Sequence, residues 1–337
     1  PSLLPLFFPH HLPYCRLSFL KNMHRRTFIK NAIIVNEGRT FVGSLVIDDD
    51  RIEEILEGQD VQPQLPPDSV IDAEGCYLLP GVIDEHVHFR DPGLTAKGNF
   101  YTESRAAAAG GVTTVIDMPN TVPPTVTKER LLQKIEIAQQ QSLVNFGFFL
   151  GATPDNAARL KDVNPRLVAG IKLFMGSSTG ELQVEDRPTL RTIFEQSQLP
   201  IMVHCEDTPM ITANMKAYKK KYGEDPHVRY HAEIRPSEAC VKSTKEAIAL
   251  AREFNVKIHV AHITTAAELD LFDPNDKQIT AETCLPHLMF ASEDYERLGA
   301  RIKCNPAVKY DTYRAAIRAA LTDGRIRTIG TDHAPHR

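Results

Sequence analysis

From residue 81 onward, short runs rich in β-branched residues alternate with stretches rich in strong helix formers. Eight runs are typical of strands, at 81–89, 112–118, 144–151, 168–175, 200–206, 257–263, 278–283 and 325–331. The clearest helical stretches are 128–141, 208–222, 237–254 and 311–321. Such alternation predicts an α/β fold with a parallel sheet, and eight repeats predict a (β/α)8 TIM barrel. An open doubly wound sheet is the alternative, but the GxGxxG turn that it favours is absent after the first strand.

Length and composition narrow the range of functions. The 337 residues suffice for one large domain with a small appendage, and 42% hydrophobic and 24% charged residues are ordinary for a globular protein. A net charge of -4 without a long basic run argues against a nucleic-acid surface. No apolar run approaches the roughly 20 residues of a membrane span. Six cysteines without a CxxC pair suit reduced thiols. We therefore expect a cytoplasmic protein without nucleic-acid or membrane partners.

The N-terminal part divides into two segments. Residues 1–22 are apolar and proline-rich, and we expect a disordered leader outside the fold. An export signal is the alternative, although its basic residues would precede the apolar stretch rather than follow it. Residues 23–78 contain strand-like runs at 27–35, 41–47 and 51–55, which predict a small domain of antiparallel hairpins, like one layer of a β-sandwich. Residues 79–337 then form the barrel domain.

Metal-binding residue types accompany the predicted barrel strands. His86 and His88 end the first strand one residue apart, so their side chains point to the same side. The other strands carry Lys172, His204, His262 and Asp332. Each residue alone has a structural explanation, such as a hydrogen-bonded core histidine or a loop-capping aspartate. Because barrel enzymes place catalytic groups at the C-terminal ends of strands, the set together predicts a metal-dependent active site.

Lys172 is the least expected member of this set. It stands in an otherwise apolar strand, where an unpaired ammonium is costly and would repel a metal ion. If CO2 adds to its ε-nitrogen, the resulting carbamate is an anion whose two oxygens can bridge two divalent ions. The alternative is an unmodified lysine of lowered pKa that acts as a base or forms a Schiff base. The four histidines favour the carbamate.

Several motifs resemble the amidohydrolase superfamily and, within it, the dihydroorotase family. They are HVHFRDPG at 86–93, DMPNT at 117–121, GIKLFM at 170–175, VHCE at 203–206, VAH at 260–262, KCNP at 303–306 and GTDHAPH at 330–336. The HxH pair and the aspartate are shared across the superfamily. The HFRDPG, MPNT, CNP and TDHAPH strings are considerably narrower.

The resemblance implies a site with two divalent metals, usually zinc. His86, His88, Lys172 and Asp332 would hold one metal, and Lys172, His204 and His262 the other. A hydroxide between the metals would attack the cyclic amide of dihydroorotate, and Asp332, as the catalytic residue, would carry its proton to the departing ring nitrogen. The product is N-carbamoyl-aspartate, and the reverse reaction belongs to de novo pyrimidine biosynthesis.

Four further residues are candidates for substrate contacts. Arg90 shares the strand face of His88, and its guanidinium matches the exocyclic carboxylate of dihydroorotate, although a salt bridge at the rim is the structural alternative. Asn120, Asn305 and His336 can supply further contacts.

Other functions remain open at this stage. Hydantoinase, dihydropyrimidinase and allantoinase share the metal site, and a lysine on the fourth strand is common to them, whereas some dihydroorotases carry an aspartate in that region. A non-catalytic scaffold of the same fold should have lost ligands, and none of the six is missing. A homodimer is compatible with the sequence.

Members of this family continue beyond the motif of the eighth strand. The additional part supplies a last helix, a loop over the substrate and strands that complete the small β layer. The resemblance therefore implies that the C-terminal part of the fold is missing from these 337 residues. If they are the whole chain, we expect poor stability and little activity.

Overall fold

The computed structural model describes residues 25–176 and 182–336, so the expected leader at 1–22 lies outside the described residues. The chain forms two compact units that divide between Val82 and Ile83. Each unit is described by itself. In the described ranges, no helix is long and apolar enough to cross a membrane.

The N-terminal unit is one five-stranded sheet. Its hairpins are antiparallel, and their strands are β1 (Arg26–Asn36), β2 (Arg39–Asp48) and β3 (Arg51–Glu57). These three strands confirm the predicted runs. The strands β4 (Ser69–Asp72) and β5 (Tyr77–Leu78) pair parallel with β1, so the expectation of a purely antiparallel layer was wrong. The physical reason is the proline-containing connection after β3, which crosses over and returns the chain in the direction of β1.

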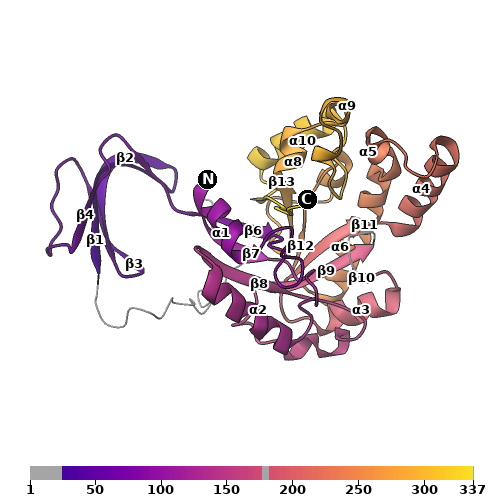
Figure 1. Ribbon diagram of the computed structural model, residues 1–337, viewed down its shortest axis with the longest axis horizontal. Coiled ribbons are helices and arrows are strands. Elements are labelled where there is room, and N and C mark those ends of the chain that lie inside the picture. Colours follow the sequence, from indigo (N-terminus) through magenta and orange to yellow (C-terminus); the bar gives the residue numbers. More distant parts are fainter. Residues whose placement is uncertain (1–24, 177–181, 337) are drawn as a thin grey trace. The chain divides into compact units, whose positions relative to one another are not determined.

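The second unit is built on eight parallel strands whose order follows the sequence. They are β6 (Val82–Val87), β7 (Val112–Asp117), β8 (Asn145–Gly151), β9 (Gly170–Gly176), β11 (Ile201–Glu206), β12 (Ile258–Val260), β13 (Ile279–Cys284) and β14 (Thr328–Gly330). The short β10 (Gln183–Val184) pairs with β9. The eight predicted strands and the (β/α)8 barrel are thereby confirmed (Figure 1).

The barrel closes between β6 and the segment that follows β14. Val87 forms a parallel bridge with His333, and the backbone amide of His88 donates to the carbonyl oxygen of His333 at 2.7 Å. This closure brings the two ends of the barrel sequence together at the predicted ligands.

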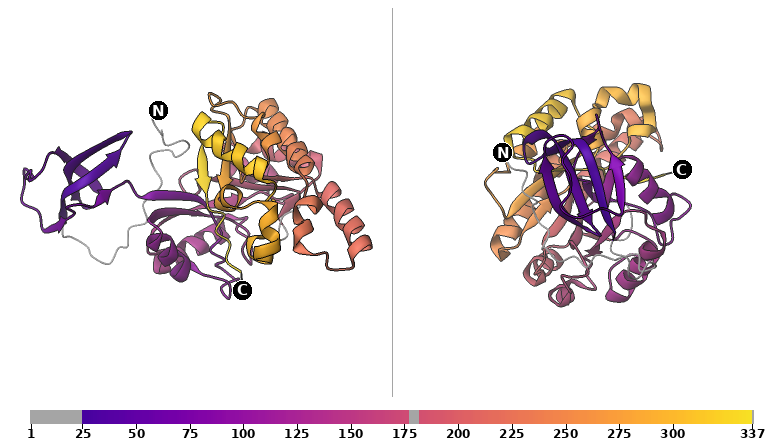
Figure 2. Two further views of the ribbon diagram at one scale, coloured as in Figure 1. Left: turned by 90° about the horizontal axis from the view of Figure 1, so that it is seen from above. Right: turned by 90° about the vertical axis from the view of Figure 1, so that its left-hand side faces the viewer.

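Helices lie outside the strands (Figures 1 and 2). The α-helices are α1 (Phe100–Ala109), α2 (Lys128–Gln141), α3 (Arg187–Gln196), α4 (Thr208–Tyr222), α5 (His231–Ile234), α6 (Ser237–Phe254), α7 (Ala266–Leu269), α8 (Leu285–Met289), α9 (Tyr295–Leu298) and α10 (Asp311–Asp323). The 3-10 helices are η1 (Ala157–Asp162), η2 (Val228–Tyr230), η3 (Ser292–Asp294) and η4 (Gly299–Ile302). The predictions for α2, α4 and α6 are confirmed, and α10 ends two residues later than predicted. The start of α4 is fixed by Asp207, whose side chain accepts from the amide of Met210.

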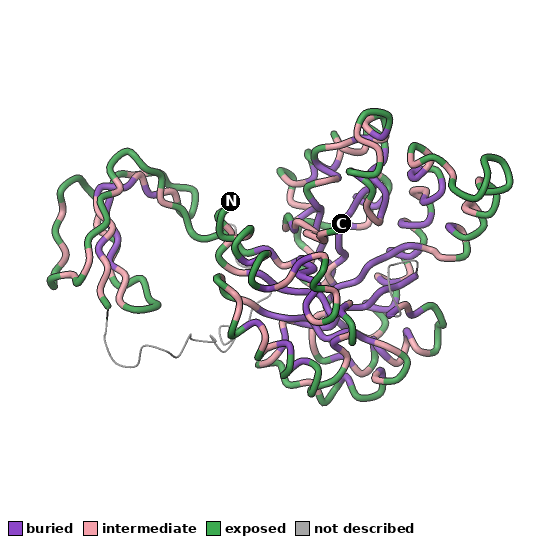
Figure 3. The backbone as a smooth tube through the Cα atoms, in the orientation of Figure 1, coloured by how far each residue is buried: buried purple, intermediate pink, exposed green. Residues whose placement is uncertain are grey.

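Every residue of β9 and β11 is buried, whereas β6, β7 and β14 also contain exposed residues (Figure 3). Ile171 and Leu173 of β9 belong to the hydrophobic core beneath the helices, as does Val203 of β11. Because side chains alternate along a strand, Lys172 and His204 point to the opposite face, into the barrel. The apolar layer therefore holds the strands in register while the alternate positions are free to carry polar groups.

Candidate metal centre

The structure brings all six predicted ligands to one end of the barrel. His86 lies in β6 and His88 just after it, Lys172 lies in β9, His204 in β11, His262 two residues after β12 and Asp332 two residues after β14. Five are buried, and the side chain of Asp332 is 17% exposed.

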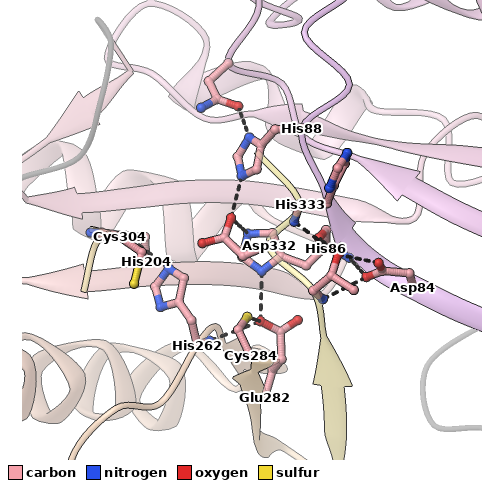
Figure 4. A network of polar contacts seen from close by, with 12 residues as sticks. Asp84, His86, His88, His204, His262, Glu282, Cys284, Cys304, Asp332 and His333 are labelled. Atoms are coloured by element: carbon pink, nitrogen blue, oxygen red, sulfur yellow. Dashed lines mark hydrogen bonds and ion pairs between the residues drawn. The ribbon is translucent and has the colours of Figure 1, made fainter. Parts of the chain in front are cut away.

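Two histidine nitrogens converge on one carboxylate oxygen. Nε2 of His88 lies 3.0 Å from Oδ1 of Asp332, and Nε2 of His86 lies 3.4 Å from the same atom (Figure 4). Ligand atoms that bind one tetrahedral metal at about 2.0–2.1 Å are roughly 3.3 Å apart. The ligand atoms of these three residues therefore fit one divalent ion.

A second pair of nitrogens faces one another nearby. Nδ1 of His204 lies 2.9 Å from Nε2 of His262, and the ring centroids are 4.7 Å apart. Two ligands of one metal have a similar separation. His86 links the two groups, because its ring centroid lies 5.4 Å from that of His88 and 5.5 Å from that of His262.

Lys172 is fully buried, and within residues 25–176 and 182–336 its Nζ has no hydrogen-bond partner. Burial lowers its pKa, against the opposing charges of Glu282 and Asp332. A buried ammonium without a hydrogen-bond partner is expensive, so this position favours a neutral amine or a modified one. The donor set of four imidazoles, a carboxylate and a modifiable lysine fits two divalent ions.

Asp332 has an electrostatic setting that keeps it ionised. Burial alone would raise its pKa, but the charge of His86 and the hydrogen bond from His88 bring the pKa well below its usual range. Its backbone has a φ of 50°. The carboxylate is therefore available both as a ligand and as a proton acceptor.

Arg90 and His336 lie together beside this centre. Nη2 of Arg90 lies 3.1 Å from Nε2 of His336, and Nε of Arg90 donates to the carbonyl oxygen of Pro335 at 3.3 Å. No carboxylate pairs with Arg90 among the described residues, so the rim salt bridge that sequence analysis left open is not formed there. Arg90 is 6% exposed and lies near the candidate ligands His88 and Asp332.

The two asparagines have different surroundings. Oδ1 of Asn120 lies 2.7 Å from Nδ1 of His88, so Asn120 contacts a candidate metal ligand. Oδ1 of Asn305 lies 3.1 Å from Nε2 of His231 on α5. Their contacts with a substrate stay predictions.

Comparison with known proteins assigns the family. The sequence profile of the amidohydrolase family matches residues 77–336. The chain belongs to this family. The dihydroorotase of Methanosarcina mazei is 34% identical to this amidohydrolase over 320 residues, 91% of this chain and 68% of the relative. The allantoinase of Deinococcus radiodurans is 34% identical, over 80% of this chain and 62% of that protein.

Solved structures agree with this assignment. The L-hydantoinase (dihydropyrimidinase) of Arthrobacter aurescens matches the amidohydrolase with a TM-score of 0.85 and 28% identity, over 93% of this chain and 70% of that chain. The amidohydrolase thus spans about two thirds of the length of its relatives. It is a metal-dependent hydrolase among cyclic amidohydrolases.

Three carboxylates around the centre of the amidohydrolase were missed by sequence analysis. Glu282 of β13 contacts His86, Glu206 of β11 contacts His204, and Asp84 of β6 contacts Thr331. Their signal was a charged residue in or beside a strand that was otherwise apolar. That signal shows burial of a charge but not which ligand the charge contacts.

Proposed function

We propose that this amidohydrolase is a dihydroorotase, which hydrolyses the cyclic amide of dihydroorotate reversibly to N-carbamoyl-aspartate in de novo pyrimidine biosynthesis. The observation that carries the proposal is the buried guanidinium of Arg90, which follows the metal ligand His88 by two residues and has His336 at 3.1 Å. A site with this cation suits a cyclic amide that bears a carboxylate.

We further propose that the site holds two zinc ions. His86, His88, Asp332 and a carbamate formed on Lys172 would hold one, and the same carbamate with His204 and His262 the other. Bound divalent metals supply Lewis acidity and lower the pKa of water. The fit rests on the buried Nζ of Lys172 and on ligand atoms 2.9 to 3.4 Å apart.

The residues around the metals would then have separate roles in the reaction. Asp332 accepts the proton of the attacking water and returns it to the ring nitrogen that departs, for which its ionised state is suited. Arg90 and His336 bind the exocyclic carboxylate and hold the ring amide toward Asp332. Asn120 and Asn305 add amide contacts to the ring.

A second candidate is a cyclic amidohydrolase for uncharged rings, of the hydantoinase, dihydropyrimidinase or allantoinase type. It is favoured by the similarity to an allantoinase at 34% identity and by the L-hydantoinase structure. A non-catalytic scaffold is the third candidate. The complete set of six ligands argues against it.

A substrate panel separates these candidates. Metal-loaded protein is assayed by ring-opening absorbance with dihydroorotate, dihydrouracil, hydantoin and allantoin, and bound metal is counted by plasma emission. We expect turnover of dihydroorotate alone. The variant Arg90→Gln should raise KM for dihydroorotate roughly 10- to 100-fold at unchanged metal content, because it loses charge-assisted hydrogen bonds. The variant Arg105→Gln, which alters an exposed arginine on α1, should match the wild type. Turnover of an uncharged ring instead would refute the dihydroorotase proposal.

A further inference from the structure

We propose that Glu282 is a positioning residue that holds the ligands of both metals in register. It lies on β13, the strand between β12 and β14, which carries none of the six predicted ligands. The inference rests on the proposed metal site and deepens it.

One oxygen of Glu282 contacts both ligand groups. Oε1 lies 2.8 Å from Nδ1 of His86, and it accepts from the backbone amide of His262 at 3.1 Å (Figure 4). His86 belongs to the first proposed metal and His262 to the second. A shift of this carboxylate would therefore move a ligand of each metal.

The contact with His86 selects the tautomer of the ring. The positive charge of bound metals would favour the ionised form of Glu282, which only accepts hydrogen bonds. In the metal-loaded site, Nδ1 of His86 would then carry the proton and Nε2 would present its lone pair. That Nε2 is the atom that points toward Asp332, at 3.4 Å. Without the acceptor, the other tautomer would turn an N–H toward the metal.

The contact with His262 fixes a backbone rather than a side chain. His262 has a φ of 43°, in the left-handed region that a histidine rarely adopts. The amide that Glu282 accepts from belongs to this residue. Holding it directs Nε2 of His262 toward His204, at 2.9 Å.

The neighbouring strand leaves room for this carboxylate. Gly330 of β14 pairs with Cys284 in the sheet register. A Cβ on Gly330 would collide with Oε2 of Glu282, and it would lie 2.7 Å from Cδ of Glu282 and 2.9 Å from Cβ of His86. The φ of Gly330 is not positive, so space and not backbone conformation requires glycine here. Two positions, 282 and 330, are thus matched to one another.

The fold alone gives little reason for a charge at this place. Glu282 is fully buried, and in the described part of the chain its Oε2 has no hydrogen-bond partner. An apolar residue of similar size would pack in the barrel without the desolvation cost. The contacts of Oε1 with groups of His86 and His262 supply the missing reason.

The test measures metal binding rather than turnover. The variants Glu282→Gln and Gly330→Ala are compared with the wild-type chain for Zn2+ affinity by competition with a chromophoric chelator. Co2+ stoichiometry and the visible Co2+ spectrum report on ligand geometry, and the Tm of chelator-treated protein reports on folding. Glu268→Gln is the matched control, because Glu268 is also buried but bonds to Thr244 and Thr265.

We expect Glu282→Gln to keep a metal-free Tm close to that of the wild type. Gly330→Ala should lower the metal-free Tm, because the added Cβ has to displace Glu282 and His86. The affinity of both variants for both metals should fall roughly 10- to 100-fold, with a changed Co2+ spectrum, as is typical when the hydrogen-bond partner of a ligand histidine is altered. Glu268→Gln should bind metal like the wild type whatever its Tm. The inference would be overturned if both variants bound the two metals with wild-type affinity. It would also be overturned if they lost only one metal equivalent. A wild-type chain that binds no metal would overturn the proposed metal site as well, which separates the two failures.

Discussion

At the scale of single residues, two fully buried lysines show how the surroundings decide chemistry. Nζ of Lys134 lies 2.5 Å from Oδ2 of Asp117 and 2.7 Å from the carbonyl oxygen of Met118. Nζ of Lys172 has no such hydrogen-bond partner among the described residues, and burial lowers its pKa. CO2 reacts with a neutral amine, so Lys172 and not Lys134 is the residue that is prepared for carbamylation.

This contrast predicts that metal binding depends on bicarbonate. Chelator-treated protein that is reloaded with Zn2+ in CO2-depleted buffer should bind less metal than protein reloaded with bicarbonate. Native mass spectrometry should find one added CO2 only in the second sample, and Lys172→Met should abolish both effects. Lys134→Met should lower stability, because it leaves the buried charge of Asp117 unpaired, but should keep the bicarbonate dependence. Full metal loading without CO2 would show that Lys172 acts unmodified.

The convergence of the candidate ligands could be predicted from sequence, whereas the side chains that contact them could not. His86 and His88 stand at a strand end with a period of two, and strand ends of a barrel meet in space. Glu282 and His86 are 196 positions apart, and their contact depends on the register by which β6 and β14 close the barrel. Nothing in local periodicity specifies that register.

At the scale of elements, the closure of the barrel depends on a clamp between β6 and the segment after β14. Asp84 accepts from the amide of Thr331 at 3.1 Å and from its hydroxyl at 2.5 Å. The hydroxyl of Thr331 in turn accepts from the amide of His333 at 3.0 Å. Asp332 lies between these two residues, so the clamp fixes the backbone of the proposed catalytic carboxylate.

Removal of the clamp should lower both the stability of the fold and its affinity for metal. Asp84→Ala loses hydrogen bonds to a charged acceptor and should lower the free energy of unfolding by about 3 kcal/mol, and Thr331→Val by about 1 kcal/mol. Urea unfolding of chelator-treated protein measures both effects. Thr322→Val, which removes an exposed hydroxyl on α10, is the control and should cost less than about 0.5 kcal/mol. Equal stability of all three variants would contradict the role of the clamp.

Secondary structure was predictable where segments were long and periodic, as for α2, α4 and α6. The strands β12 and β14 are only three residues long, shorter than the runs 257–263 and 325–331. His262 lies within the first run but outside β12, and Asp332 lies one residue beyond the second run; both have a positive φ. The local sequence of these runs favours strand and does not show where β12 and β14 end.

At the scale of the whole molecule, the barrel buries an unusual number of titratable groups. Burial is the leading cause that lowers the pKa of His86, His88, His204, His231, His259, His262 and His287. The pKa falls to about 4 for His231 and His287. Burial conversely raises the pKa of Glu85 and Glu282 to about 8.

These shifts predict an acid-sensitive fold in the metal-free protein. Below about pH 6.5 the seven histidines take up protons in the unfolded chain but stay neutral in the folded one, so the free energy of unfolding falls as the pH falls. Burial also raises the pKa of Glu268 and Asp91. These four carboxyls act in the opposite direction, because below their raised pKa they are protonated in the folded state while the unfolded chain stays ionised until about pH 4. Seven histidines outweigh four carboxyls, so stability should decline between about pH 6.5 and pH 4.5.

Urea midpoints of chelator-treated protein across this range test the prediction. The variant His287→Gln keeps a donor for the carbonyl oxygen of Pro306, which Nε2 of His287 contacts at 3.0 Å, but it cannot titrate. Its free energy of unfolding should therefore fall less than that of the wild type between about pH 6.5 and pH 4.5. The difference should reach up to about 3 kcal/mol, since a shift of one pKa unit corresponds to about 1.4 kcal/mol. A midpoint that stays constant from about pH 7 to pH 5 would mean that the buried imidazoles take up protons in the folded barrel as readily as in the unfolded chain. Burial would then not keep them neutral as metal binding requires.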